Sequence, residues 1–528
     1  MRTRRLAVAA ASAFVSLPAP RSIAVAQAGA HFEVAETTIA QVHAAFQARQ
    51  LTCRELVQAY LDRIAAYDRR GPAINSLVTL NPDALAIADS LDRRFGREGL
   101  TGPLHCVPMI VKDNFETAGM QTTAGSLSLA GWMPRRDATM VARIKASGAI
   151  VLAKSNLAEW AFTPYETVSS ILPGYTRNPY DLARVTAGSS GGTAAAIAAS
   201  LGLVGLGTDT GNSIRGPSAH QALFGIRSTM GLTSRAGVVP LSNFADIAGP
   251  MARSVADAVK VFDVVAGSDS ADSVTASADS RRARDYNAFL KPGALRGARI
   301  GVLRQAYETA TTDTEVVRVF ESALGELRTA GATVLDTVGL DSLRAITRGK
   351  GSCSTFKYDV ERYFAARGEG APVKTVDEVL RSGRFHPTVQ GRLQAAQRDT
   401  VPPERQPGCA YRDQVTRPQF RAAITALMDS LKLDALVYPT WSNPPRLIGD
   451  LNTPHGDNSQ LFSPLSGLPA MTIPMGYTRS NTLPAGMTFL GRAWDEGRLI
   501  ALSYDYERVA RHRKPPSATP PLPGQVRD

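Results

Sequence analysis

The sequence is poor in the residues that build metal centres. It has only four cysteines and seven histidines, and the cysteines form no C-x-x-C pair and no Cys/His set with ligand spacing. It also contains no H-E-x-x-H segment. The pattern therefore predicts no zinc site and no metal-dependent hydrolase.

Blocks of basic residues are also missing. The formal net charge is +12, but lysines and arginines are spread along the chain and are not interleaved with aromatic side chains. This distribution does not provide the basic stripe of a nucleic-acid-binding surface. We therefore expect no nucleic-acid partner.

Long apolar runs are missing except at the N-terminus. Three arginines among the first five residues precede an apolar run over residues 6–17 and an Ala-Gln-Ala segment at 26–28, which is the order of an export signal and its cleavage site. The run is shorter than the roughly 20 residues of a membrane span. We expect residues 1–28 to be a removable signal of the general or twin-arginine type, and the protein to be periplasmic or secreted without stable membrane insertion.

The cysteine pattern has two interpretations. If the chain is exported, Cys353 and Cys409 can form a disulfide, because export compartments are oxidising. The equal alternative is that the cysteines are free and buried.

The hydrophobic pattern switches between helical and strand periodicity, which is typical of α/β proteins. Helical patterns cover residues 38–49, 53–68, 82–96, 137–147, 315–330 and 495–511. Strand patterns cover 75–80, 106–111, 149–154, 299–303, 332–335, 436–440, 470–475 and 486–494. The region 340–432 is less regular, and its aromatic residues Phe356, Tyr358, Tyr363 and Phe385 are candidates for a substrate pocket. The Pro-rich tail from residue 515 is expected to be loosely ordered.

Two serine-bearing loops flank a stretch of small residues. The first, Gly188-Ser189-Ser190-Gly191-Gly192, runs into an alanine-rich helix, and the second, Thr208-Asp209-Thr210-Gly211-Asn212-Ser213, follows an apolar strand. A serine after a strand, among residues that tolerate unusual dihedral angles, suits a nucleophile with converging backbone N–H groups. Either loop alone is more often a linker or a helix cap, but the compact apolar segments around both favour catalysis.

Lys112 directly follows the apolar segment 107–111. Most lysines are solvated surface charges. A lysine at the end of a buried strand has its stem in the core, where desolvation lowers its pKa and makes the neutral amine available as a base. We expect Asp113 and Asn114 to orient it by hydrogen bonding.

Together these elements resemble the signature of the amidase signature family, the Ser-Ser-Lys amidohydrolases. In that family a GGSSGG loop carries a bridging serine in a cis peptide, and a later GTDxGGSIR loop carries the nucleophile. The matching positions are Ser189 and Ser213, 24 residues apart, and VPMIVKDN at 107–114 supplies Lys112. The core motifs lie within 104–260, and the resemblance covers nearly all of 29–528.

The resemblance implies one large α/β domain with a mixed central sheet covered by helices on both faces, and no cofactor. It implies that Ser213 attacks an amide carbonyl while Ser189 and neutral Lys112 relay the proton. The backbone N–H groups expected to form the oxyanion hole belong to Thr210, Gly211, Asn212 and Ser213. The side chains expected to hold the loops in shape are Ser190 and the oppositely charged Asp209 and Arg215.

Two residues depart from the family pattern. Ala187 replaces the first glycine of GGSSGG, and Asn212 replaces the glycine before the nucleophile. Asparagine tolerates left-handed dihedral angles, so the turn can survive. Its side chain is expected to project near the oxyanion and to influence rate or substrate choice.

The resemblance also bears on the substrate and partners. The motifs look closest to peptide-amidase-like members and to the A subunit of the glutamyl-tRNA amidotransferase. An export signal argues against the latter, because its tRNA and its partner proteins are cytosolic. We therefore expect a small-molecule or peptide amide as substrate. The sequence does not predict the acyl group, the amine or the oligomeric state.

Two alternatives stay open at this point. The first loop also satisfies G-x-S-x-G, so Ser190 can be the nucleophile of an α/β-hydrolase elbow, with His386 or His455 as its base. The second alternative is an exported binding protein on an amidase scaffold that Asn212 has impaired.

Overall fold

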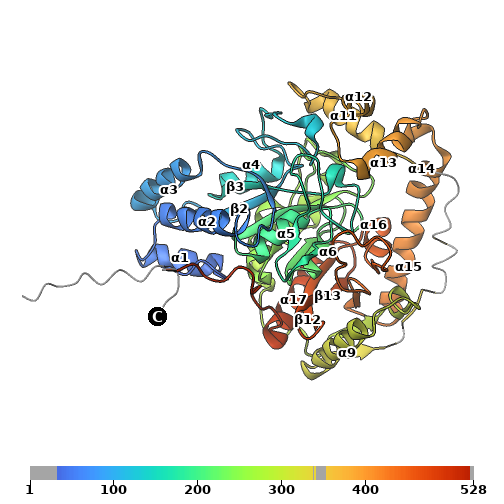
Figure 1. Cartoon of the computed structure of the whole chain (residues 1–528). Helices are drawn as coiled ribbons and strands as arrows, with labels where there is room; N and C mark the ends of the chain where they lie inside the picture. Colours follow the sequence, from blue (N-terminus) through green and yellow to red (C-terminus); the bar gives the residue numbers. More distant parts are fainter. Residues whose placement is uncertain (1–31, 337, 341–345, 347–352, 524–528) are drawn as a thin grey trace, which may run out of the picture.

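The computed structural model describes residues 32–336, 338–340, 346 and 353–523. The predicted export signal at 1–28 lies outside the described residues. At the centre is an 11-stranded sheet with helices packed around it (Figure 1). In spatial order its strands are β1 Leu77–Leu80, β3 Ile150–Ser155, β2 Pro108–Lys112, β6 Val204–Asp209, β8 Ile247–Ala252, β7 Phe224–Arg227, β12 Ala470–Thr478, β13 Leu483–Leu490, β11 Ala435–Pro439, β9 Arg299–Val302 and β10 Thr333–Leu335.

The sheet is mixed, as predicted. Strands β3, β2 and β6 run parallel, and so do β11, β9 and β10, whereas the other neighbouring pairs are antiparallel. A separate two-stranded sheet pairs β4 Arg177–Asn178 with β5 Asp181–Val185. The carboxyl ends of parallel strands meet at one edge, so the residues that follow β2 and β6 lie side by side.

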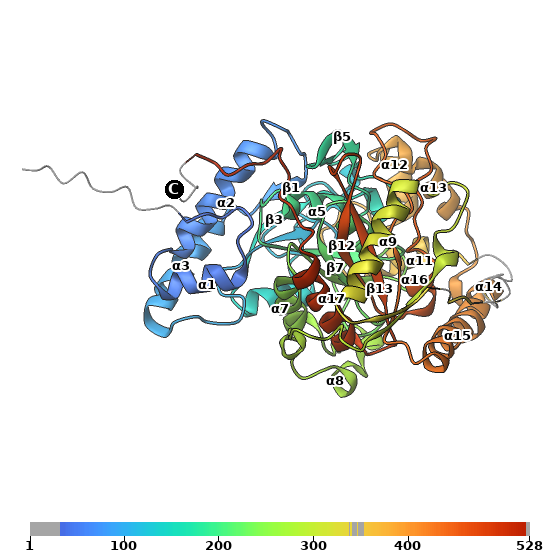
Figure 2. The ribbon, with the colours of Figure 1, turned by 90° about the horizontal axis from the view of Figure 1, so that it is seen from below.

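Helices flank the sheet in Figures 1 and 2. Those in the first half of the chain are α1 Ile39–Gln47, α2 Cys53–Tyr67, α3 Ala84–Glu98, α4 Thr139–Ala146, α5 Gly191–Ala198, α6 Arg215–Ala219 and α7 Val255–Val265. The later ones are α8 Ala278–Arg281, α9 Thr314–Thr329, α11 Phe356–Arg367, α12 Val376–Ser382, α13 Pro387–Gln397, α14 Pro407–Tyr411, α15 Arg417–Ser430, α16 Phe462–Ser466 and α17 Glu496–Ala510. No helix among the described residues is long and apolar enough to cross a membrane.

The helices and strands predicted from periodicity are all present, with shifted ends. The largest shift is in β13, which begins before the predicted segment and ends at Leu490, four residues before the predicted end. Strands β7 and β8 were not predicted from periodicity. Glycine interrupts both, and β8 also contains Pro250, so neither has a regular strand pattern.

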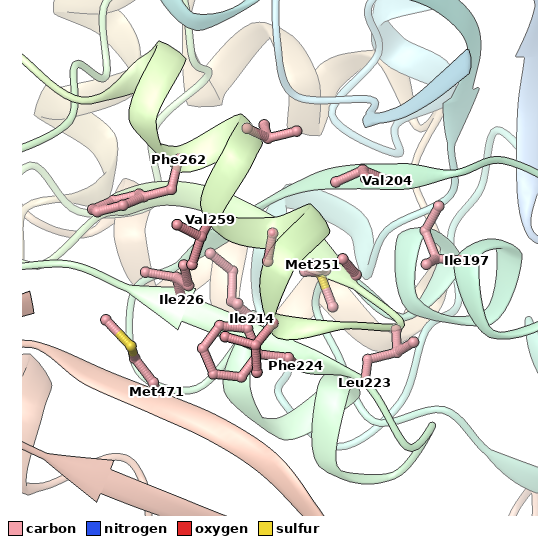
Figure 3. Packing of buried hydrophobic residues seen from close by; sticks show 14 of the residues in the cluster. Ile197, Val204, Ile214, Leu223, Phe224, Ile226, Met251, Val259, Phe262 and Met471 are labelled. Atoms are coloured by element: carbon pink, nitrogen blue, oxygen red, sulfur yellow. The ribbon is translucent and has the colours of Figure 1, made fainter. Parts of the chain in front are cut away.

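Small residues bring α5 close to the sheet. A side chain at Gly205 of β6 would place its Cβ 2.3 Å from Cγ2 of Thr193, and one at Gly192 would place it 2.3 Å from the Asn156 carbonyl oxygen. Figure 3 shows apolar side chains of α5, α7 and the neighbouring strands packed into one cluster. The close approach fixes the N-terminus of α5, where the first serine loop ends.

Two disulfides tie peripheral helices to the rest of the fold. Cys353 pairs with Cys409, which was one of the two interpretations of the sequence. Cys53 at the start of α2 pairs with Cys106 just before β2, a bridge that the sequence analysis did not predict. No free cysteine is present in the part of the chain that the structure describes.

The Pro-rich tail was predicted to be loosely ordered, and this was wrong for residues 515–523. The Arg63 guanidinium donates hydrogen bonds to the carbonyl oxygens of Thr519 and Pro520 at 2.9 and 3.0 Å, and the Tyr67 hydroxyl donates to Pro520 at 2.7 Å. Figure 1 shows this end of the chain running back to α1 and α2. The two ends of the described chain are therefore packed together.

The region 340–432 forms helices α11 to α15 where it is described. Of its aromatic residues, predicted as pocket candidates, Phe356 is buried with its ring 4.5 Å from that of Phe162. Tyr363 lines a cavity beside Arg235 and Arg367, and its hydroxyl donates to Glu116 at 2.6 Å. These contacts join the helical region to the segment that precedes the first serine loop.

Candidate active site

Lys112 lies at the end of β2 and is completely buried. Its Nζ donates hydrogen bonds to the Ser189 hydroxyl at 2.8 Å and to the Thr208 hydroxyl at 2.6 Å. Burial lowers the pKa of the Lys112 amine to about 7, although the carboxylates of Asp246 and Asp209 favour the charged form. A lysine with this pKa is partly neutral near pH 7 and can accept a proton.

The residues after Lys112 act differently from the prediction. Asn114 donates to Thr208 at 3.2 Å, so it orients the lysine through the threonine that both contact. Among the described residues, no hydrogen bond or ion pair joins the Asp113 carboxylate to the Lys112 amine. Its carboxylate instead forms a buried ion pair with Lys154 at 3.0 Å and accepts a hydrogen bond from the Thr123 hydroxyl.

The first serine loop, residues 187–192, is held in an unusual shape. The peptide bond between Gly188 and Ser189 is cis, as the resemblance implies. Gly188 donates to the Pro164 carbonyl at 2.7 Å, and a side chain on Gly188 would collide with neighbouring backbone. Ala187 has φ +61° and is buried beside Trp441, so alanine keeps the left-handed turn at a position where the family pattern has glycine.

The second serine loop, residues 208–213, carries Ser213, which is 5% exposed and therefore nearly buried at the site. The backbone N–H groups that donate no hydrogen bond to any described residue are those of Thr210, Gly211, Asn212 and Ser213. These are the predicted oxyanion-hole donors, and their role in binding a ligand oxygen stays a prediction. Within the described chain no hydrogen bond joins the hydroxyls of Ser189 and Ser213.

Buried charges brace the second serine loop. Asp209 forms ion pairs with Arg215 at 3.0 Å and with Arg227 at 3.1 Å, and all three side chains are buried. Burial raises the pKa of the Asp209 carboxyl, but the two guanidinium groups outweigh this effect and hold it at about 2. The predicted pair is thus part of a buried triad rather than a surface ion pair. Sequence reasoning missed Arg227, for which the only signal was a charged residue ending an apolar strand.

The Asn212 side chain does not take the expected position. It is fully buried and packs against α6, where a Cβ on Gly216 would lie 2.2 Å from Asn212 Nδ2. The amide nitrogen and oxygen of this side chain have no hydrogen-bond partner among the described residues. Gly216 therefore provides the space for Asn212 under the loop.

Ser190 links the two serine loops. Its hydroxyl donates to the Thr208 carbonyl at 3.1 Å, and its N–H donates to the Ser213 carbonyl at 3.3 Å. The side chain is buried, and the preceding strand β5 belongs to the small hairpin instead of the central sheet. This arrangement is unlike a nucleophile elbow, whose serine stands exposed above a central strand.

The histidines considered as bases for Ser190 are engaged elsewhere. The His386 side chain caps α13 through Thr388, and His455 stacks on Tyr165 with ring centroids 3.9 Å apart. No cluster of three or more His, Cys, Asp or Glu side chains that can hold a metal ion occurs among the described residues.

Comparison with known proteins places this arrangement in a family. The family model described as Amidase matches residues 55–500. A probable amidase of Arabidopsis thaliana is 30% identical over 506 residues, which cover 92% of each chain. The A subunit of the glutamyl-tRNA(Gln) amidotransferase of Acinetobacter baumannii is 33% identical over 475 residues, covering 87% of this chain and 93% of the relative.

Among solved structures, the native peptide amidase of Stenotrophomonas maltophilia superposes with a TM-score of 0.81 and 38% identity, covering 91% of this chain and 98% of that chain. The fold and the site thus define a mixed α/β enzyme that acts on amides. The chain belongs to the Amidase family, and it is an amide-hydrolysing enzyme.

Proposed function

We propose that the protein hydrolyses carboxamide C–N bonds through an acyl-enzyme on Ser213, with Ser189 and Lys112 as the proton relay. The observation that carries this proposal is the 2.8 Å contact between Lys112 Nζ and Ser189 Oγ in a buried site. Burial lowers the pKa of the lysine to about 7, which makes a neutral amine available. The second serine loop carries the proposed nucleophile, Ser213, and backbone N–H groups that donate no hydrogen bond to a described residue.

The chemistry follows from these groups. Neutral Lys112 accepts the proton of Ser189 while Ser189 accepts that of Ser213, and the Ser213 oxygen attacks the amide carbon. The backbone N–H groups of 210–213 bind the oxygen that gains negative charge, and each well-placed donor contributes about 3 to 4 kcal/mol to the transition state. The relay then runs backwards to protonate the departing nitrogen, and water attacks the acyl-enzyme.

The proposed relay also needs a hydrogen bond between the hydroxyls of Ser189 and Ser213, which we expect to form in the substrate complex. We propose that the Ser213 hydroxyl, which forms no hydrogen bond to any described residue, turns towards Ser189 when substrate binds. Catalytic hydrogen bonds are often long without substrate and shorten when it binds. Ser190, Asp209 and Arg215 hold the loops in place for this step.

We propose a small amide or a peptide amide as the substrate. Support comes from the likeness to a peptide amidase over 91% of this chain. We also propose that the protein is exported, which the two disulfides support because such bonds persist in oxidising compartments. Export disfavours a role in a glutamyl-tRNA amidotransferase, the activity named for the other relative.

Covalent labelling tests the proposed nucleophile. The protein is treated with a fluorophosphonate, and the modified residue is identified by peptide mapping and mass spectrometry. We expect the adduct on Ser213, and we expect Lys112→Ala to reduce both labelling and ammonia release from a peptide amide by at least about 10²-fold, the usual range for general-base catalysis. Lys260→Ala, which removes a lysine of α7 outside the site, is the matched control.

Each other outcome overturns a stated part of the proposal. An adduct on Ser190 favours the elbow mechanism. No adduct and no turnover of amides or esters favours a binding protein on an amidase scaffold. Labelling of Ser213 that Lys112→Ala leaves unchanged removes the lysine from the relay.

A further inference from the structure

The segment 441–460 borders the second serine loop. The Arg215 guanidinium donates to the Ser459 carbonyl at 3.1 Å. A Cβ on Gly211 would lie 2.6 Å from Oε1 of Gln460, so this side chain rests on one of the oxyanion donors. The end of this segment is therefore in contact with the loop that carries Ser213.

The same segment also meets the first serine loop. Val185, just before that loop, donates its N–H to the Arg446 carbonyl at 3.0 Å. Tyr165 packs against the buried cluster of Ala187 and Trp441. Arg446 and Tyr165 thus lie beside the chain that leads to Ser189.

Arg446, Tyr165 and His455 form one cluster, which we call the rim cluster. The rings of Tyr165 and His455 stack 3.9 Å apart at 24°. The Arg446 guanidinium carbon lies 5.6 Å from the centre of the Tyr165 ring. Stacking fixes the orientation of both the aromatic rings and the guanidinium group.

Arg446 forms no ion pair with a carboxylate of the described chain, although its charge favours the ionised forms of Asp450 and Glu166. Its residue is only 9% exposed, and its guanidinium makes one long hydrogen bond, 3.4 Å to the Thr453 carbonyl. A nearly buried arginine without an anion is rare, because removing the charge from water costs free energy that an ion pair normally offsets. The other N–H groups of the Arg446 guanidinium are available to a ligand.

The acidic side chains near Arg446 form no ion pair with it among the described residues, and Asp450 is instead hydrogen-bonded by the N–H groups of Asn452 and Thr453, both at 3.0 Å. Asp457 already accepts hydrogen bonds from the Ser459 N–H at 3.0 Å and from Gln460 Nε2 at 2.8 Å. Glu166 forms no ion pair with Arg446 within the described residues. Burial raises the pKa of the Asp457 carboxyl to about 7 and also raises that of Glu166, which Arg446 partly opposes. The Asp457 carboxyl is thus less negative near neutral pH than an exposed one.

We propose that the rim cluster is a substrate subsite in which Arg446 binds a carboxylate on the acyl part of the amide. This inference rests on the proposed amidase function. A primary carboxamide releases only ammonia, so selectivity must come from contacts to the acyl part. The guanidinium fork binds a carboxylate through paired hydrogen bonds, and Tyr165 and His455 pack against the carbon chain that carries it.

The test compares peptides that differ in one charge. The probes are N-acetyl-glutamyl-phenylalaninamide, its methionyl analogue, which is similar in length and neutral, and its lysyl analogue, with the carboxylate product measured by mass spectrometry. We expect kcat/KM for the glutamyl peptide to exceed that for the methionyl peptide by about tenfold, mainly through KM, which is the usual strength of a hydrogen-bonded charge pair. The preference is expected to fall between about 0.05 and about 0.5 M NaCl.

Variants of Arg446 identify the group responsible. Arg446→Met is expected to remove the preference for the glutamyl over the methionyl peptide, and Arg446→Lys is expected to keep part of that preference. Arg318→Met, at an exposed arginine of α9, is the control and is expected to keep the preference. If Arg446→Met does not fold, the salt dependence of the glutamyl preference in the native enzyme tests the subsite instead.

The outcomes separate the subsite from the amidase function. Amides hydrolysed without charge preference, or with preference for the lysyl peptide, overturn the subsite and leave the amidase function intact. The probes are also titrated against Ser213→Ala protein by calorimetry. Tighter binding of the glutamyl peptide without turnover by the native enzyme supports the subsite and rejects the proposed catalysis.

Discussion

A buried amine beside a hydroxyl makes the activity depend on pH. Burial lowers the pKa of Lys112 to about 7, and only the neutral amine can take a proton from Ser189. We predict that kcat/KM rises with pH, with a midpoint near 7, and then reaches a plateau. Below the midpoint the lysine is already protonated, so each pH unit lost reduces the rate by up to about tenfold. Initial rates between pH 5 and 9, measured with one neutral amide, check this prediction.

A second buried group titrates in the same range and must be separated from Lys112. The pKa of Asp457 is also raised to about 7 by burial. Asp457→Asn is the control, and we expect it to keep the rise in kcat/KM near pH 7. If that rise disappears or moves by more than a pH unit, the titration belongs to Asp457 and not to the lysine.

At the scale of elements, the fit of α5 against its neighbours sets the position of Ser189 and Ser190. Gly192 in the first turn faces the backbone of Asn156, and a methyl group there would lie within 2.3 Å of the carbonyl oxygen. We predict that Gly192→Ala displaces the start of α5, lowers the free energy of unfolding by about 1 to 3 kcal/mol and reduces kcat. Urea unfolding and steady-state kinetics on the same preparations measure both effects.

A second glycine gives a matched comparison. Gly325 lies within α9, and no other group comes within 4 Å of the position its Cβ would take. Gly325→Ala is expected to stabilise the protein by up to about 1 kcal/mol, because alanine favours the helix, and to leave kcat unchanged. If Gly192→Ala and Gly325→Ala had the same free energy of unfolding and the same kcat, the packing of α5 would not control the site.

The sequence predicted elements better than contacts between them. Lys112, Ser189 and Ser213 were singled out because the apolar strand and the glycine-rich loops that carry them resemble the motifs of a known family in order and spacing. Thr208 could have been found from the parallel strands β2 and β6, whose ends meet at one edge. The partner of Asp113 could not, because Lys154 is distant in sequence and the choice between Lys112 and Lys154 depends on side-chain direction.

At the scale of the molecule, long-range ties hold the two ends of the described chain. The disulfide between Cys53 and Cys106 spans 53 residues, and α2 also holds residues 519 and 520 through Arg63. The bridge between Cys353 and Cys409 spans 56 residues. The cysteine spacing alone left this pairing open, because a sequence does not show which thiols lie within bonding distance. Both bridges restrict the unfolded chain, so stability depends on the compartment in which the protein folds.

Folding in two compartments tests export and the disulfides together. We predict that the full chain, made in a bacterial host, appears outside the cytoplasm without residues 1–28 and without free thiols. The chain from residue 29, made in a reducing cytoplasm and kept reduced, is expected to lose up to about 4 kcal/mol of unfolding free energy per disulfide, the loop-entropy contribution for bridges of this span. N-terminal sequencing, thiol titration and urea unfolding supply the measurements.

A variant with alanine at all four cysteines is the control, because its stability should not depend on the compartment. Free thiols in exported protein, or equal stability of the oxidised and reduced native chains, would contradict the prediction.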